Sequence, residues 1–189
     1  FVAIDLDSTD SVTYSFADSS VPFLVAPSSG SVGTSRPLDR EVIPFYNVTL
    51  IATDLAGAQA RTVLRVAVED INDENPVFSA LEYTRSISEA TAPFSFLVQV
   101  MATDADDVNQ GGNAQLSFKF SGPSSLLQIN STSGVITTAS SLDRESASVI
   151  RVTVIAEDGG LRQATASVIV TVTDSNDNAP AFGDDTYSA

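Results

Sequence analysis

The sequence predicts an all-β protein made of two antiparallel β-sandwiches in tandem. Three features support this prediction: alternating apolar and polar residues, frequent turn signals, and an internal repeat. The alternation runs over residues 46–53 and 150–156, and residues 62–68 and 164–172 are expected to form the strands that follow. Short segments of this kind, with Asp, Asn and Gly turns about every ten residues, favour a sandwich. Helical periodicity between them is missing, which disfavours a parallel α/β sheet.

The internal repeat has a fixed spacing. The segment Leu-Asp-Arg-Glu at residues 38–41 recurs at 142–145, and Asp-Ile-Asn-Asp at 70–73 recurs as Asp-Ser-Asn-Asp at 174–177. In both cases the starting residues differ by 104. This period is long enough for one sandwich domain to bury its own core. The 189 residues are therefore expected to hold two such domains.

The register of the repeat also predicts where the domains begin and end. We expect a first domain at residues 1–75, a complete second domain at 76–179, and the start of a following repeat at 180–189. Glu89 of the second copy has no counterpart in the first, because the register would place that counterpart before Phe1. The first copy is thus expected to lack its opening strand and this Glu.

Composition excludes several classes of function. The net charge of −15, from 24 acidic and 9 basic residues, disfavours nucleic acid and anionic membranes as partners. Cys and His are absent, which excludes disulfides, Cys/His zinc sites, cysteine nucleophiles and Ser-His-Asp triads. Apolar runs stay well below the roughly 18 residues of a membrane-spanning helix, so this segment is expected to make no direct membrane contact.

The acidic residues gather in short clusters with Asn and Gly between the predicted strands. Calcium takes about six to eight oxygen ligands from carboxylates, carbonyls and water, and clusters of this composition can supply them. For any one cluster taken alone, ordinary turn formation is the better explanation, so the clusters must be considered together. Carboxylates about 4 Å apart, however, repel by about 4 kcal/mol at an effective dielectric near 20, and turns require no such crowding. The spacing is not that of an EF-hand.

Five motifs together resemble the cadherin extracellular repeat, and the resemblance covers the whole chain. They are Ser88-Glu89-Ala90, Asp104-Ala105-Asp106, Leu142-Asp143-Arg144-Glu145, Ala156-Glu157-Asp158 and the run from Asp174 to Pro180. The resemblance implies two tandem seven-stranded Greek-key β-sandwich repeats of immunoglobulin-like type, the first truncated at its N-terminus. It also implies up to three Ca²⁺ ions at each complete junction between repeats.

The resemblance further implies which residues bind calcium at the junction in this chain. The first repeat and the linker are expected to supply the carboxylates of Asp39, Glu41, Asp70 and Asp73, the side chain of Asn72, and the carbonyls of Ile71 and Glu74. The second is expected to supply the carboxylates of Asp104, Asp106 and Asp158 and the carbonyl of Asn113. These seven carboxylates carry −7 and three Ca²⁺ ions supply +6, so the charges nearly cancel.

Two departures from the family pattern affect these sites. Glu74 stands where the family usually has Asn, but a backbone carbonyl is expected there, so the change should be tolerated. The absent Glu of the first copy would bridge two of the three ions, and those two are expected to bind weakly in this chain. The remaining ion is expected to be least affected, and its ligands include Asn72, Asp104, Asp106 and Asp158.

Other acidic residues are expected to form half-sites that face adjacent repeats on both sides. Those facing a preceding repeat are Asp5, Asp7 and Asp54. Those facing a following repeat are Glu89, Asp143, Glu145, Asp174, Asn176 and Asp177. Asn47 and Asn130 each begin an Asn-x-Thr tripeptide and are possible N-glycosylation sites.

The resemblance implies a calcium-dependent cell–cell adhesion ectodomain, extracellular and part of a plasma-membrane protein. Its partner would be another cadherin ectodomain, homophilic or heterophilic. An alternative keeps the fold and the calcium but makes these repeats internal, force-bearing spacers whose adhesive contacts lie elsewhere. An enzyme such as a glycosidase with paired carboxylates is disfavoured, because the acidic clusters recur with the repeat whereas an active site needs only one constellation.

Overall fold

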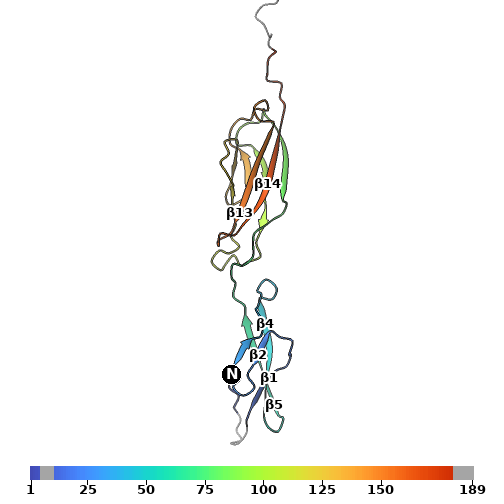
Figure 1. Ribbon diagram of the computed structural model, residues 1–189, viewed down its shortest axis with the longest axis vertical. Helices are drawn as coiled ribbons and strands as arrows, with labels where there is room; N and C mark the ends of the chain where they lie inside the picture. The colour runs from blue at the N-terminus through green and yellow to red at the C-terminus, as the bar shows by residue number, and fades with distance from the viewer. Residues whose placement is uncertain (5–10, 181–189) are drawn as a thin grey trace, which may run out of the picture. The chain divides into compact units, whose positions relative to one another are not determined.

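The computed structural model describes residues 1–4 and 11–180, and in this part of the chain every regular element is a β-strand (Figure 1). The chain divides into two compact units, Phe1–Ile71 (unit 1) and Asn72–Ala189 (unit 2). The prediction of an all-β protein is confirmed.

Unit 2 contains two main sheets and a short two-stranded ribbon. One sheet has the order β10-β13-β14-β7, the second has the order β11-β12-β8, and β6 pairs with β9. The strands are β6 (Val77–Phe78), β7 (Glu82–Ser88), β8 (Phe96–Gln99), β9 (Ala102–Thr103), β10 (Ser117–Phe120), β11 (Leu127–Ile129), β12 (Val135–Thr138), β13 (Val149–Glu157) and β14 (Gln163–Thr173).

The connections of unit 2 are those of a Greek-key sandwich. The chain passes from one sheet to the other between β10 and β11, and it returns between β12 and β13. With β6 and β7 taken as halves of one broken strand, and β8 and β9 as halves of another, the described part of unit 2 has seven strands. β7 pairs parallel with β14, whereas the other pairs are antiparallel. The parallel pair was not expected from the sequence.

The core of unit 2 lies between the two sheets. On β14, alternate residues from Ala166 to Val172 are buried, as the period of two along a strand requires. They pack with fully buried side chains of the other sheet, such as Val98, Leu127 and Ile136. Each buried side chain of this size contributes about 1.5–3 kcal/mol, so the sandwich is held mainly by this layer.

Unit 1 repeats part of this plan. Its sheets have the orders β1-β4-β5 and β2-β3. The strands are β1 (Thr13–Phe16), β2 (Phe23–Val25), β3 (Val32–Thr34), β4 (Phe45–Thr53) and β5 (Gln59–Ala67). β1, β2, β4 and β5 begin 104 residues before β10, β11, β13 and β14, and β3 begins 103 residues before β12. The strands therefore follow the period found in the sequence.

The described residues of unit 1 form no counterpart of the strands β6 to β9. Leu64, Val66 and Val68 in and after β5 are accordingly only half-buried, whereas the equivalent side chains in β14 are buried beneath the second sheet. The core of unit 1 centres instead on Tyr14 and Leu50. The same sequence pattern thus gives less burial where fewer strands cover it.

Candidate metal centre

Three acidic side chains converge at one end of unit 2. Asp104 follows directly after β9, with Asp106 two residues later, and Asp158 follows directly after β13. One carboxylate oxygen from each lies within 4.8 Å of the other two. Asp106 is 5% exposed and Asp158 is 4% exposed. Three negative charges so close together repel one another, and a cation would relieve this repulsion.

The two acids after β9 are held by a local turn. Oδ1 of Asp104 accepts a hydrogen bond from the amide of Asp106 at 3.0 Å. Oδ1 of Asp106 accepts one from the amide of Glu74 at 3.4 Å. Oδ2 of Asp104 is buried and accepts no hydrogen bond from any residue in the described part of the chain. A buried carboxylate oxygen of this kind is unfavourable unless a ligand or a cation satisfies it.

Asp158 uses its two oxygens differently. Oδ1 accepts hydrogen bonds from the amides of Gly160 and Arg162, both at 2.8 Å, and so closes the tight turn after β13. Leu161 occupies the left-handed region in this turn, with φ of 70°. Oδ2 faces the side chain of Asn72. The turn therefore fixes the carboxylate while leaving one oxygen directed at the cluster.

Asn72 brings an amide group to the same place. Its Nδ2 lies 3.1 Å from Oδ2 of Asp158 and 3.5 Å from the carbonyl oxygen of Asn113. A half-turn of the amide would direct Oδ1 toward these atoms instead. Asn72 can therefore donate to the two oxygens, or join them as an oxygen ligand for a cation.

The donor set fits calcium. All candidate ligands are oxygens, from three carboxylates, one side-chain amide and one backbone carbonyl, and calcium prefers this mixture. Nitrogen and sulfur ligands, which favour zinc or copper, are missing because the chain has no His or Cys. The buried Oδ2 of Asp104 is the observation that favours a bound cation over a simple turn.

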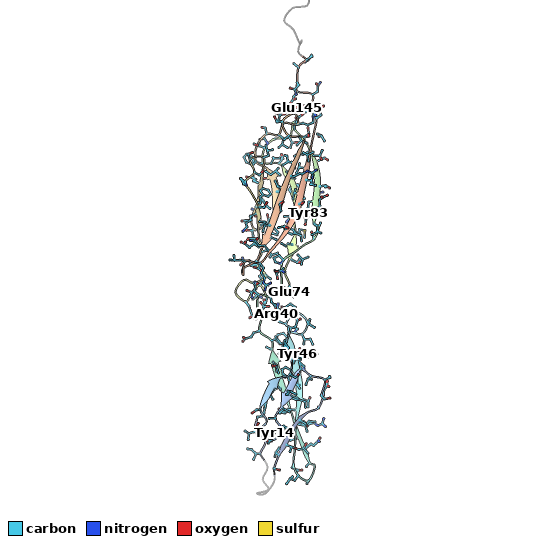
Figure 2. All side chains as sticks on the ribbon, in the orientation of Figure 1. Tyr14, Arg40, Tyr46, Glu74, Tyr83 and Glu145 are labelled. Carbon is cyan, nitrogen blue, oxygen red and sulfur yellow. The ribbon has the colours of Figure 1, made fainter. Side chains whose placement is uncertain are left out.

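A second acidic cluster lies at the other end of unit 2. Glu89, Glu145 and Asp174 each offer an oxygen within 4.8 Å of the others. Figure 2 shows Glu74 and Glu145 at opposite ends of this unit, with Tyr83 between them. The described part of the unit thus carries one group of acidic side chains at each end.

This second cluster is already stabilised by protein groups. Glu89 is 5% exposed, and its two oxygens accept hydrogen bonds from the amides of Arg144 and Ser175, each at 2.6 Å. The guanidinium of Arg144 donates to Asp174 at 2.9 Å and also contacts Glu145. These contacts, first with Asp174 and then with Glu145, raise the pKa of Arg144. Arg144 thus acts as an internal cation between two expected calcium ligands.

Unit 1 repeats this arrangement at the equivalent position. The guanidinium of Arg40 lies 2.5 Å from Oε1 of Glu41 and pairs with Oδ1 of Asp70 as well. The side chain of Asp70 is completely buried. The arginine of the Asp-Arg-Glu motif therefore bridges the same two acids in both copies.

The other expected ligands fall into three groups. Some accept hydrogen bonds from nearby amides in turns, and these are Asp39, Asp54 and Asp143. For Asp143 the hydrogen bonds from Ser146, its hydroxyl first, lower the pKa. Some are exposed at the surface, and these are Ile71, Asp73, Glu74, Asn176 and Asp177. Asp5 and Asp7 lie outside the described residues.

Sequence reasoning missed the basic and small residues around the acids. Arg162 donates to the carbonyl of Asn72 at 3.1 Å, and a Cβ added to Gly160 would come within 2.6 Å of the Asn72 side chain. The repeated Asp-Arg-Glu motif was a signal for Arg40 and Arg144, because both arginines recur with the ligands. Arg162 gave no comparable signal.

Comparison with known proteins identifies the family. The family model described as Cadherin domain matches residues 1–69 and 83–173, well over half of the chain. The chain belongs to the cadherin family. Among curated relatives, Protocadherin Fat 4 of Homo sapiens is 36% identical over 192 residues, which cover 97% of this chain and 4% of that protein. The chain thus spans only a small part of that cadherin's length.

Solved structures show the same tandem cadherin fold. One is described as Protocadherin Gamma B2 extracellular cadherin domains 3-6 and has a TM-score of 0.82 at 30% identity, covering 94% of this chain and 44% of that one. Another, described as a Protocadherin gammaB7 EC3-6 cis-dimer structure, has a TM-score of 0.83 at 31% identity, covering 94% and 44%. The cadherin repeats of this chain are accordingly extracellular and belong to a plasma-membrane protein.

Two further expectations concern the surface of these cadherin repeats. Asn47 is exposed on β4, and Asn130 is exposed in the turn between β11 and β12. Oδ1 of Asn130 accepts hydrogen bonds from the amides of Thr132 and Ser133. Both asparagines are accessible, and their glycosylation stays a prediction. Within the described residues, helices of the length and apolarity that a bilayer crossing requires are missing.

Proposed function

We propose that these cadherin repeats are part of a calcium-dependent cell–cell adhesion ectodomain in which calcium stiffens the connection between repeats. The observation that carries the proposal is the convergence of Asp104, Asp106 and Asp158 at one end of unit 2, with Asn72 and the Asn113 carbonyl beside them. The charge of −3 from three carboxylates opposes this convergence, and a Ca²⁺ ion of charge +2 offsets most of it.

Asn72 gives the ion its mechanical effect. It lies in the segment before β6, whereas the three carboxylates lie in loops of the sandwich. An ion bound to both therefore adds to the contacts that hold the connecting segment on the sandwich, and part of its binding free energy stabilises that ordered arrangement. We propose that the first repeat and the linker complete two more sites. Their ligands would be Asp39, Glu41, Asp70, Asp73 and the carbonyls of Ile71 and Glu74.

Stiffness is what an adhesion protein requires from such a module. A rigid array holds its binding surfaces in place, so that several weak contacts act together. Extracellular calcium modules typically have dissociation constants of about 10⁻⁴–10⁻³ M, which suits extracellular calcium. We propose another cadherin ectodomain as the partner, homophilic or heterophilic. One similar structure is described as a cis-dimer, which supports association between copies.

A second role, as an internal spacer, is favoured by one observation. The chain matches only 4% of Protocadherin Fat 4, a protein far longer than two repeats. In such an array most repeats transmit force, and few make the adhesive contact. Both roles use the same calcium chemistry, and in neither do the acids serve catalysis. The acidic clusters recur with the repeat, as structural sites do.

Calcium titration of the whole chain tests the proposal. We expect isothermal titration calorimetry to give dissociation constants in the submillimolar to millimolar range, about that of extracellular calcium modules. Small-angle scattering should then show an extended, stiff particle that becomes flexible in chelator. Asp104→Asn and Asp106→Asn should weaken binding and reduce the scattering response. Glu82→Gln removes an equal charge from an exposed site on β7 and serves as the control. An unchanged response in both aspartate variants would contradict the ligand assignment.

A further inference from the structure

Arg162 is a basic residue that contacts both Asp158 and Asn72 at the metal centre, and it is not among the expected calcium ligands. Its Nε donates to the carbonyl oxygen of Asn72 at 3.1 Å, and its Nη1 donates to Oδ1 of Asn75 at 3.2 Å. The two acceptors lie at the two ends of the segment 72–75, which precedes β6. A single guanidinium therefore spans the whole segment, which its planar fork of donors allows.

The turn after β13 fixes where this guanidinium points. The amide of Arg162 donates to Oδ1 of Asp158 at 2.8 Å, and its carbonyl accepts from the amide of Asp158 at 3.1 Å. The backbone of Arg162 is thus held on both sides by one residue. Since β14 begins at the next residue, the side chain starts from a rigid point of the sandwich.

Gly160 in the same turn provides the space that Asn72 needs. A Cβ at position 160 would come within 2.6 Å of Cγ and Nδ2 of Asn72, closer than real contacts allow. Any larger residue would push Asn72 away from the turn. Arg162 and Gly160 therefore act together, one by holding Asn72 and the other by letting it approach.

We propose that Arg162, with Gly160, docks the segment 72–75 on unit 2 before calcium binds, so that the ligand Asn72 is already in place when the ion arrives. All the contacts involved are between protein groups. They are the two hydrogen bonds of Arg162, the bond from Asn72 to Asp158, and the bond from the Glu74 amide to Asp106. Removal of calcium then frees the chain before Asn72 and leaves residues 72–75 attached.

Arg162 is thus a positioning residue, and because it is charged, its two possible effects on calcium affinity have opposite directions. A cation beside a calcium site repels Ca²⁺, so charge alone predicts tighter binding when Arg162 is replaced. Positioning predicts weaker binding, because the ion must then pay the entropy of ordering the segment itself. The part that concerns calcium rests on the proposed function, whereas the docking of the segment does not.

The first test needs no calcium. In chelator, ¹H–¹⁵N heteronuclear NOEs of residues 73–75 in the whole chain should match those of β13 and β14. In Arg162→Met the NOEs of residues 73–75 should fall to the values of a flexible chain. In Arg162→Lys they should be intermediate, since one ammonium group cannot reach both acceptors. Arg151→Met, which removes the same charge from an exposed site on β13, should leave them unchanged. Flexible residues 73–75 in the unsubstituted chain would overturn the proposal.

The second test measures calcium binding at this site through the amide signals of Asp104, Asp158 and Gly160. Arg162→Met should weaken binding about tenfold, because hydrogen bonds from a charged donor and the order they impose are lost. Arg151→Met should bind as the unsubstituted chain does. Unchanged or tighter binding in Arg162→Met would refute the positioning role. If the unsubstituted chain bound no calcium but kept residues 73–75 ordered, the proposed function would fail while the docking stood.

Discussion

Replacing Asp104 with Asn should change the stability of unit 2 in opposite directions without and with calcium. Asp104, Asp106 and Asp158 offer oxygens within 4.8 Å of one another. Two unit charges at that separation repel by about 3 kcal/mol at an effective dielectric of about 20. The substitution removes two of the three repulsive pairs, and Asn keeps the Oδ1 acceptor that receives the Asp106 amide. Allowing for hydration and relaxation, we expect the free energy of unfolding in chelator to rise by about 1–2 kcal/mol.

Calcium should reverse the order of the two proteins. A ligand at 100 times its dissociation constant stabilises the folded state by about 2.7 kcal/mol. If the substitution weakens binding about 100-fold, the same calcium stabilises the variant by only about 0.4 kcal/mol. The variant should therefore be more stable than the unsubstituted chain in chelator and less stable in calcium.

Urea unfolding, followed through the amide signals of β13 and β14, measures both differences on unit 2 alone. Glu82→Gln serves as the matched control, because it removes one exposed carboxylate far from any cluster in the described residues. Equal destabilisation of the Asp104 variant in both conditions would mean that this carboxylate supports the turn rather than a cation. The reasoning from charge crowding would then be wrong.

Three further outcomes follow from the same structure. Gly160→Ala should weaken calcium binding by displacing the linker asparagine, measured by titration, whereas Gly122→Ala, whose added Cβ meets no atom within 4 Å, should bind as before. Glu89→Gln should destabilise unit 2 in chelator by about 1–3 kcal/mol, because the NH₂ group of Gln would face the backbone amide of Arg144 or of Ser175, which is also a donor. A denaturation midpoint at or above that of the unsubstituted chain would contradict this. The hydrogen bond from Lys119 holds the pKa of Glu157 below its ordinary value, so the stability from this contact is present above the ordinary pKa and is lost as pH falls through the lowered pKa. Lys119→Met should therefore raise the pKa of Glu157 in a carboxyl NMR titration. An unchanged pKa would contradict the assignment.

Part of the site could be predicted because its acidic residues lie in short, recognisable sequence motifs at the ends of strands. Asp104 and Asp106 stand two residues apart at the end of one strand, and Asp158 stands at the end of another. Asp158 recurs 104 residues after Asp54, and the pair Asp104 and Asp106 recurs 99 residues after Asp5 and Asp7. This repetition indicated that the motifs belong to the plan of the domain rather than to isolated turns. No sequence motif indicates the role of Arg162, because its partner Asn72 is 90 residues away in the sequence. Only the fold brings the two together.

By itself the sequence determined the strand class, the two copies and the acidic composition of the domain ends. These properties depend on neighbours along the chain, through the two-residue period of a strand and the preference of Asp and Asn for turns. The tertiary structure decided the parallel pairing of β7 with β14, the reduced burial of β5, and the arginine contacts of both repeats. Each of these depends on which segments, distant in the sequence, pack together or form ion pairs. A local sequence pattern cannot predict that.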